Sequence, residues 1–300
     1  MKVIVFGGSG FLGSHVVDVL LERGYEVVVF DLKPSPYLKK AGTMVVGDVM
    51  DQKAVDGVVK GADAVYNFAG IADIDKAKID PVETVRQNIL GNSMILDACR
   101  KNKIGRFLFA SSVYVYSNSG SFYRTSKRSC EYIIEDYQKA YGLNFTIMRY
   151  GSLYGPRADE KNWIHSILQQ ALNEGKITRE GDGEELREYI HVHDAARISV
   201  DMLDEQHSNK HVMITGNHVI KIKDLLIMVR EIFNNKIEIV YVPSSEEEHY
   251  EITPYSFNPK IAKRVVSNSY LDLGQGILDM IDDVYGEFMR REKHEKAYLK

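Results

Sequence analysis

The stretch that most constrains the fold is "VIVFGGSGFLGSHVV", residues 3–17. An apolar, β-branched run is followed by Gly7, Gly10 and Gly13, and a segment with helical periodicity comes next. Glycines at this spacing let main-chain amides at the positive end of a helix approach a pyrophosphate, which side chains would block. The stretch predicts a strand, a phosphate-binding turn and a helix, although the glycines alone are also compatible with an ordinary tight turn.

Short β-branched runs alternate with longer helical segments through the first half of the chain. We expect strands near 2–6, 26–30, 43–46, 64–68, 106–111 and 145–149, and helices near 52–60, 81–102 and 122–141. This alternation is typical of βαβ units. The fold class it predicts is α/β, with a Rossmann-type doubly wound parallel sheet.

The pattern loosens after residue 151, where Gly and Pro interrupt it. We expect helices near 161–174, 194–204 and 222–233, and strands at "YIHV", "HVMIT" and "IEIVYV". Residues 1–150 would form the dinucleotide-binding domain, and 188–239 would return to it. Residues 151–187 and 240–300 would form a smaller C-terminal α/β lobe that binds substrate.

Composition excludes several partner classes. The net charge is −4 with acidic and basic residues interspersed, so neither nucleic acid nor an anionic membrane surface is an expected partner. No apolar run reaches the roughly 18 residues of a membrane span. Cys99 and Cys130 both lie in helix-like stretches, which favours a reducing compartment, and we expect the cytoplasm.

Two aspartates follow predicted strands where a dinucleotide would lie. Asp31 ends the second strand, 18 residues after Gly13, where a carboxylate can accept hydrogen bonds from an adenosine ribose diol. Its charge would oppose a 2′-phosphate, which favours NAD over NADP, although Lys33 nearby weakens that exclusion. Asp48 ends the third strand and could reach the adenine edge or simply cap a turn.

A tyrosine and a lysine lie close to the end of the fifth strand. Tyr123 and Lys127 are four residues apart, on one helix face, and Tyr123 follows Ser112 by eleven residues. Strand ends of an open α/β sheet point into the crevice that holds the ligand. We therefore expect Ser112 and Tyr123 to face the reactive ring of the dinucleotide.

Several further motifs support a family resemblance: "FDL", "GDV", "NFAG", "NILGN", "FASSVYVYS", "YRTSK", "RYGSLYGPR" and "LREYIHVHDAA". With them the chain resembles the extended short-chain dehydrogenase/reductase superfamily, in its NAD-dependent nucleotide-sugar epimerase/dehydratase branch (UDP-glucose 4-epimerase-like). The resemblance implies NAD as cofactor and a catalytic triad of Ser112, Tyr123 and Lys127. The expected cofactor-binding residues are Gly7, Gly10, Phe11, Leu12, Gly13, Asp31, Leu32, Asp48, Val49, Phe68, Ala69, Gly70, Asn88, Tyr123, Lys127 and Tyr150.

The resemblance also implies how substrate would be held. Ser112, Ser152 and Arg187 are the expected substrate-binding residues. A forked guanidinium suits the phosphate oxygens of a nucleoside-diphosphate sugar, although a surface salt bridge is the alternative role of Arg187.

The triad needs an ionised phenol. A tyrosine with the reference pKa near 10 is only about 0.1% ionised at pH 7. Lowering that pKa to about 7 takes roughly 4 kcal/mol of differential stabilisation, which the Lys127 ammonium and the positive nicotinamide would supply. Ser112 would hydrogen-bond the reacting oxygen.

The residues after Ser112 bear on the reaction type. The 4,6-dehydratases and decarboxylases of this family usually have a glutamate there, in many dehydratases preceded by an aspartate, whereas this chain has Val113 and Tyr114. We therefore expect epimerisation, at C4, through a transient 4-keto intermediate. The alternatives are an NAD(P)-dependent reductase of a nucleotide-activated keto sugar and a non-catalytic dinucleotide-binding regulator.

Two further expectations concern metal and assembly. His191 and His193 would share a strand face, but no third and fourth ligand are evident, so no metal is expected. The predicted helices 81–102 and 122–141 carry apolar residues on more than one face, more than a single sheet contact buries. The family's usual dimer is formed by these two helices, so we expect a homodimer through them.

Overall fold

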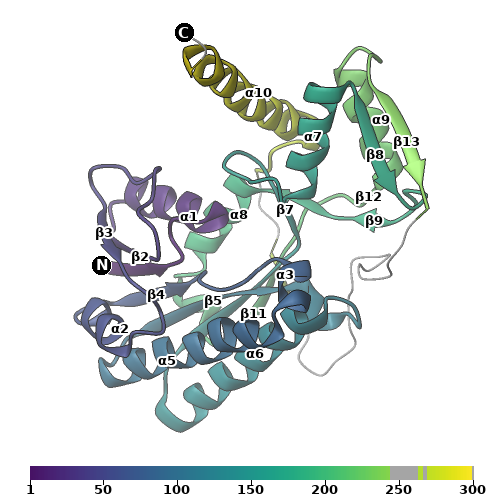
Figure 1. Ribbon diagram of the computed structural model, residues 1–300. Coiled ribbons are helices and arrows are strands. Elements are labelled where there is room, and N and C mark those ends of the chain that lie inside the picture. Colours follow the sequence, from purple (N-terminus) through teal and green to yellow (C-terminus); the bar gives the residue numbers. More distant parts are fainter. Residues whose placement is uncertain (244–262, 266–268, 299–300) are drawn as a thin grey trace.

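The computed structural model describes residues 1–243, 263–265 and 269–298, and its largest element is an eight-stranded sheet (Figure 1). Its strand order is β14-β11-β6-β5-β4-β1-β2-β3, and all its pairings are parallel. The strands are β1 (Lys2–Phe6), β2 (Glu26–Asp31), β3 (Thr43–Val46), β4 (Ala64–Asn67), β5 (Arg106–Ser112), β6 (Phe145–Tyr150), β11 (Lys210–Ile214) and β14 (Lys263–Arg264). The predicted α/β class with a doubly wound parallel sheet is confirmed.

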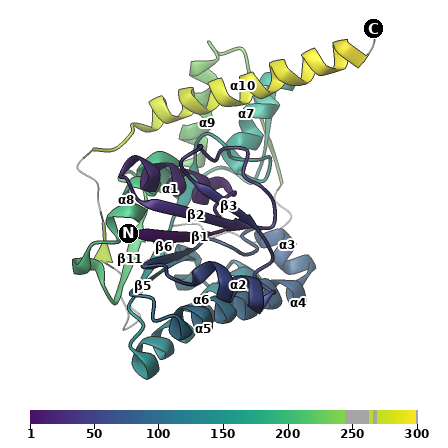
Figure 2. The same cartoon turned by 90° about the vertical axis from the view of Figure 1, so that its left-hand side faces the viewer.

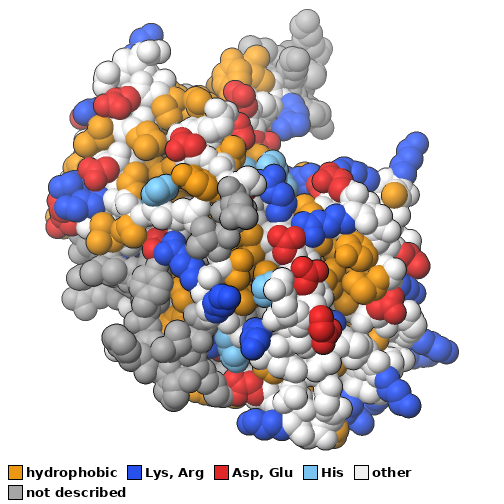
Figure 3. All heavy atoms as spheres, turned by 180° about the vertical axis from the view of Figure 1, so that it is seen from behind, with side chains coloured by type: hydrophobic (Ala, Val, Ile, Leu, Met, Phe, Trp, Pro, Cys, Tyr) orange, Lys and Arg blue, Asp and Glu red, His pale blue; other side chains and the backbone are white. Residues whose placement is uncertain are grey.

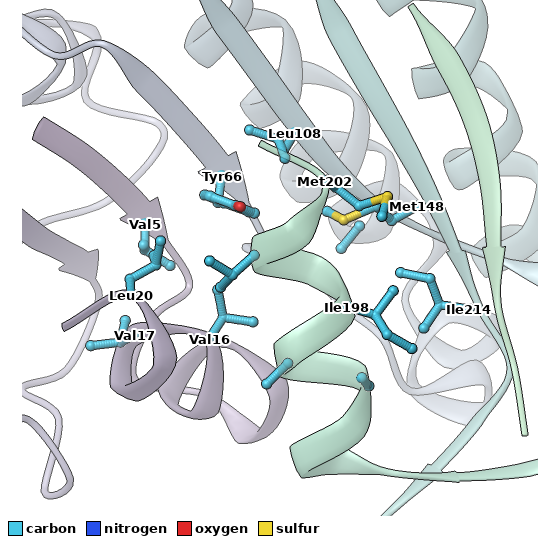
Figure 4. Packing of buried hydrophobic residues seen from close by; sticks show 14 of the residues in the cluster. Val5, Val16, Val17, Leu20, Tyr66, Leu108, Met148, Ile198, Met202 and Ile214 are labelled. Carbon is cyan, nitrogen blue, oxygen red and sulfur yellow. The ribbon is translucent and has the colours of Figure 1, made fainter. Parts of the chain in front are cut away.

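Successive strand residues divide between two cores, one on each face of the sheet. Val3 and Val5 pack in one core, while Ile4 and Phe6 pack in the other, as the two-residue repeat of a strand requires. Helices α1 (Phe11–Glu22) and α8 (Val192–Asp201) cover the first face (Figure 4). Helices α2 (Gln52–Val59), α5 (Gly91–Lys101) and α6 (Ser121–Tyr141) cover the second (Figure 2).

The order of the strands reverses between β1 and β4. Strands β2 and β3 continue on one side of this pair, and β5, β6 and β11 continue on the other. In open parallel sheets a crevice forms outside the carboxyl ends of the strands at such a reversal. The fold therefore brings the ends of β1 and β4 together as the natural ligand site.

The helix predicted over 81–102 is interrupted. It consists of α4 (Pro81–Thr84), a π-helical turn η1 (Val85–Leu90) and α5, and an unpredicted short helix α3 (Ile74–Ile79) precedes it. Asn88, in the π-helical turn, exchanges hydrogen bonds with the main chain of Ile71 and donates to Ser126 on α6. The periodicity of apolar residues in the sequence does not reveal these hydrogen bonds, because they join residues that lie far apart in the chain.

A smaller lobe packs around its own core beyond the carboxyl edge of the sheet (Figure 1). It contains α7 (Trp163–Glu174), β8 (Lys176–Glu180), β9 (Leu186–Arg187), β12 (Ile220–Lys221), α9 (Ile222–Ile232), β13 (Glu238–Val242) and α10 (Leu273–Tyr298). Strand β7 (Ser152–Tyr154) pairs with β10 (Tyr189–His191), and two short helices, η2 (Val113–Tyr116) and η3 (Glu205–His207), complete the described elements.

The expected domain boundaries need correction at two places. The segment 188–239 returns to the main sheet only through α8 and β11, because α9 packs with α7 in the small lobe and β13 pairs with β8. Conversely, β14 within 240–300 pairs with β11 in the main sheet. An apolar helix face shows that a helix is buried but not against which partner, so this division could not be foreseen. Residues 244–262 and 266–268 lie outside the described residues.

The described residues contain no helix with the length and apolar character required for a membrane span. On the face drawn in Figure 3, basic and acidic side chains are interspersed.

Candidate functional site

In the glycine turn, main-chain segments lie too close together to leave room for side chains. Gly7 has a φ of +74°, and a Cβ there would lie 2.6 Å from the Ala69 nitrogen, in the segment that follows β4. A Cβ at Gly13 would lie 2.3 Å from the Gly7 oxygen. Helix α1 begins after Gly10, and no side chain caps it and no acidic residue occupies its first turn. Its first amides are therefore suited to an anion, which is the fit required by a dinucleotide pyrophosphate.

A hollow of about 560 Å³ opens beside this turn. Eight of the predicted cofactor-binding residues line it: Gly7, Gly10, Asp31, Leu32, Val49, Phe68, Ala69 and Gly70. Lys33, noted beside Asp31 in the sequence, also lines it. Sequence reasoning missed the other lining residues, which are Ser9, Phe30, Pro34, Pro36, Gly47, Ile71, Lys76, Glu83 and Gln87. Ser9 could have been found from its place inside the glycine turn. Lys76, Glu83 and Gln87 come from helices whose approach to the sheet edge no local pattern specifies.

Main-chain amides orient the Asp31 carboxylate at the end of β2. The amide of Ser9 donates to Asp31 Oδ2 at 3.0 Å, and that of Lys33 donates to Asp31 Oδ1 at 3.4 Å. Carboxylate oxygens carry further lone pairs, so the group can still accept hydrogen bonds from a ribose diol.

Other predicted cofactor residues lie outside the lining of the hollow. Phe11 and Leu12 form the first turn of α1, and Gly13 is buried against the glycine turn. Asp48 accepts a hydrogen bond from the Met50 amide at 2.9 Å, which is the turn-capping alternative considered for it. Asn88 is buried and tied to Ile71 and Ser126, as described above.

The side chain of Tyr150 does not lie where a cofactor-binding role would place it. The ring is packed in the core between the sheet and α8, and its hydroxyl lies 2.6 Å from Ser199 Oγ. Burial raises the pKa of this phenol. The family resemblance implied that Tyr150 contacts the cofactor, but a residue at the end of a strand can point into the core as readily as into the crevice.

The predicted triad gathers where β5 ends and α6 begins. Lys127 is buried, its Nζ donates to the Ala110 carbonyl at 2.8 Å, and it lies 5.9 Å from the centre of the Tyr123 ring. Ser112 is buried two residues after Ala110, and its hydroxyl accepts from the Tyr114 amide at 3.3 Å. The Tyr114 ring meets the Tyr123 ring edge to face at 6.3 Å.

Burial is the main influence on the Lys127 ammonium. It lowers the pKa of Lys127, while the neighbouring Cys130 and Glu131 raise it. A desolvated ammonium beside a phenol is the arrangement that lowers the pKa of a tyrosine.

The predicted substrate-binding residues Ser152 and Arg187 lie on the short strands β7 and β9. Ser152 starts β7 and pairs in register with Tyr189 of β10, two residues after Arg187. Arg187 is 8% exposed, which argues against the surface salt bridge considered as its alternative role.

His191 and His193 belong to a row of imidazoles that meet edge to face. Their ring centres are 4.9 Å apart, and the His193 ring lies 4.8 Å from that of His15 on α1. Within the described part of the chain no group of three or more His, Cys, Asp or Glu side chains is arranged to hold a metal ion.

A parallel sheet with a glycine turn at its reversal point and a Tyr–Lys pair at the end of β5 defines a Rossmann-type, dinucleotide-binding protein. The model of the NAD dependent epimerase/dehydratase family matches residues 3–216. The chain belongs to this family, and its cofactor is NAD.

Relatives within the family carry out more than one reaction. The chain is 27% identical over 301 residues to a putative UDP-glucose 4-epimerase of Methanocaldococcus jannaschii, covering 93% of this chain and 97% of that protein. It is 30% identical over 232 residues to a dTDP-glucose 4,6-dehydratase of Streptomyces antibioticus, covering 69% of each.

A solved structure of a UDP-glucose 4-epimerase of Thermus thermophilus with NAD is 25% identical, with a TM-score of 0.81 and coverage of 95% of this chain and 99% of that one. The resemblance predicted from the motifs is confirmed.

Proposed function

We propose that the protein is an NAD-dependent epimerase that acts on a nucleoside-diphosphate sugar at C4. Relatives and neighbours named as UDP-sugar 4-epimerases support this proposal. The observation that carries it is the pairing of Tyr123 and Lys127 at the end of β5, with Val113 and Tyr114 directly after Ser112.

The residues divide the work of oxidising and reducing one carbon. NAD in the hollow supplies the hydride acceptor and donor. Tyr123 takes the proton of the sugar hydroxyl as the alcohol becomes a ketone and returns it when the alcohol forms again. Lys127, held against the Ala110 carbonyl, stabilises the phenolate. Ser112 holds the reacting oxygen against Tyr123.

The positions after Ser112 argue against dehydration and decarboxylation. Val113 is 1% exposed and packs against Met213, and Tyr114 packs against the Tyr123 ring. Neither side chain exchanges a proton at neutral pH as a carboxyl group does. Epimerisation needs no additional acid beside the triad.

The substrate would span the two lobes. Arg187 would pair with the diphosphate, and Ser152 would donate to the phosphate or the sugar. Arg187 is buried in the small lobe. Because charges attract more strongly where water is excluded, this burial would strengthen a pairing of its guanidinium with phosphate.

The proposal extends to assembly and location. A homodimer would form through α4–α5 and α6, which lie side by side and expose Val82, Val85, Leu90, Phe122 and Tyr132. Cys99 and Cys130 are buried free thiols, which is compatible with a reducing cytoplasm.

The test is a panel of uridine, guanosine, cytidine and thymidine diphosphate sugars followed by NMR without added cofactor. We expect interconversion of one pair of C4 epimers by the purified holoenzyme. Tyr123→Phe should lower kcat by roughly 100-fold or more, on the scale of general acid–base catalysis. Net consumption of added NADH without interconversion would favour the keto-sugar reductase. Unchanged turnover in Tyr123→Phe would contradict the assigned mechanism.

A further inference from the structure

A buried ionic cluster lies directly behind the predicted triad. Glu131 and Arg149 form a two-pronged pair, with Arg149 Nη2 2.6 Å from Glu131 Oε2 and Arg149 Nε 2.9 Å from Glu131 Oε1. Both side chains are about 95% buried. Buried ion pairs generally add little to stability compared with apolar residues of the same size, so a pair of this kind calls for another explanation.

Glu131 lies on the helix that carries the proton-transfer residues. Tyr123, Lys127 and Glu131 follow one another at four-residue spacing, so they share one face of α6. Lys127 Nζ binds the Ala110 carbonyl, and Glu131 Oε1 accepts from the Ser111 hydroxyl at 2.6 Å. Two successive turns of the helix are thus fastened to two successive residues of β5, immediately before Ser112.

Arg149 extends the same connection to the segment that follows Ser112. It pairs in register with Ser111 across β5 and β6, and its guanidinium lies 4.6 Å from the centre of the Tyr116 ring. Arg149 Nη1 also donates to the Tyr116 hydroxyl. The segment η2, between Ser112 and Tyr123, is therefore held by the same arginine.

His211 completes the cluster on β11. Its Nδ1 lies 3.0 Å from Arg149 Nη2 and its Nε2 lies 3.1 Å from Glu135 Oε1, one helical turn beyond Glu131. Burial and then the charge of Arg149 lower the pKa of His211 to about 4, so the ring is neutral at pH 7. A neutral ring that accepts at Nδ1 from Arg149 carries its hydrogen on Nε2, the nitrogen that faces Glu135.

We propose that Glu131, clamped by Arg149 and Ser111, is the positioning residue that sets Tyr123 and Lys127 against Ser112. This inference rests on the proposed function, because it assigns Glu131 a role toward the same three residues. Glu131 touches neither substrate nor cofactor in this role. Glu131 keeps α6 in one position relative to the end of β5. It contacts Ser111 on β5 and Arg149 on β6, and Arg149 in turn contacts η2 and β11.

The experiment compares variants that leave the net charge unchanged. Ser111→Ala removes one hydrogen bond of Glu131, and Ser111→Thr keeps the hydroxyl. The double variant Glu131→Leu with Arg149→Met removes the cluster and, as an exchange of a buried ion pair for apolar residues, should still fold. Thr146→Val is the matched control, since it removes the buried hydrogen bond of Thr146 to His207 at the opposite end of β6.

Activity is the first readout. Misplacement of reacting groups by about 1 Å can cost roughly 100-fold, so we expect kcat to fall roughly 10- to 100-fold in Ser111→Ala and in the double variant. KM and NAD affinity should change little, and Ser111→Thr should restore kcat. Thr146→Val should match the wild type in kcat.

The second readout needs no substrate. Ultraviolet difference absorbance of the NAD-bound protein, measured against a Tyr123→Phe background, follows ionisation of the Tyr123 phenol with pH. We expect that ionisation to move to higher pH in Ser111→Ala and in the double variant, because Lys127 is held less closely to the phenol.

The two readouts separate the two proposals. If the wild type converts no sugar in the panel, the proposed function fails. The positioning role of Glu131 is then tested by the Tyr123 titration alone. If Ser111→Ala and the folded double variant keep both the wild-type kcat and the wild-type titration, the positioning role is wrong.

Discussion

At the scale of single residues, Asp31 shows how main chain prepares a side chain for a ligand. Its two carboxylate oxygens each receive an amide hydrogen bond, from Ser9 and from Lys33. Ser9 Oγ in turn donates to the Lys33 carbonyl at 2.9 Å, so the glycine turn and the segment after β2 are fastened together around the carboxylate. These bonds hold the Asp31 carboxylate in one orientation, in which we propose that it meets the dinucleotide.

Replacing this carboxylate should change the choice of cofactor. We expect Asp31→Asn to weaken NAD binding by roughly 10-fold, because a charge-assisted hydrogen bond becomes a neutral one, a difference of about 1.4 kcal/mol. NADP binding should fall less or improve, because the negative charge that opposes a 2′-phosphate is removed. Calorimetry with each dinucleotide measures both affinities.

Asp51→Asn is the matched control for this experiment. Asp51 caps α2 through the Ala54 amide and is not among the residues lining the hollow. It should leave both affinities unchanged. An unchanged ratio of NAD to NADP affinity in Asp31→Asn would contradict the assigned role of Asp31.

At the scale of elements, the periodicity of apolar residues predicted the strands and helices whose formation depends on neighbouring residues in the sequence. The strands from β1 to β6 lie where they were expected, because each carries β-branched or aromatic residues between turn signals. The π-helical turn Val85–Leu90 was missed, since it coincides with the bonds of Asn88 to Ile71 and Ser126, residues far away in sequence. In the site, the glycine turn is readable from spacing, and the proposed triad from its place after a strand and from the family resemblance. Glu131 and Arg149 are identified only when the fold pairs them.

The apolar residues exposed on α4–α5 and α6 lead to a prediction about assembly. Tyr132 on α6 is 47% exposed within this face. We expect Tyr132→Glu to convert the proposed dimer into a monomer, because it places a charge in an apolar interface. Light scattering on a size-exclusion column reports the mass directly.

Tyr241→Glu provides the comparison, since Tyr241 is 45% exposed on β13 of the small lobe, away from these helices. It should keep the mass of the wild type. A wild-type protein that elutes as a monomer, or a Tyr132→Glu variant that remains a dimer, would rule out this interface.

At the scale of the whole molecule, the two lobes meet around three imidazoles, of which His15 and His191 are buried and His193 is exposed. His15 Nε2 on α1 lies 2.9 Å from the Pro156 carbonyl oxygen. The His15 ring meets the His193 ring edge to face, and the His193 ring meets that of His191 in the same way. The Tyr154 ring of β7 packs against His191 at 5.2 Å. Burial is the largest cause that lowers the pKa of both His15 and His191 to about 4, with neighbouring cations and imidazoles adding to it.

These depressed values predict a loss of stability in acid with a defined sign. An unfolded histidine binds its proton near pH 6.5, whereas His15 and His191 stay neutral in the folded chain down to about pH 4. The unfolded chain therefore binds more protons in this window, and the free energy of unfolding falls as the pH drops from about 6.5 towards 4. Each group contributes a slope of up to about 1.4 kcal/mol per pH unit there.

Urea unfolding at about pH 7 and about pH 5 measures this loss, and His15→Gln isolates one imidazole from it. A glutamine amide can still donate to the Pro156 carbonyl but does not titrate, so the variant should lose less stability between the two pH values than the wild type does. The carboxylates of the protein titrate equally in both chains and cancel in the difference. If both proteins lose the same free energy of unfolding, His15 takes up no proton on unfolding in this pH range. The histidine at the junction of the lobes would then not be a cause of the loss of stability in acid.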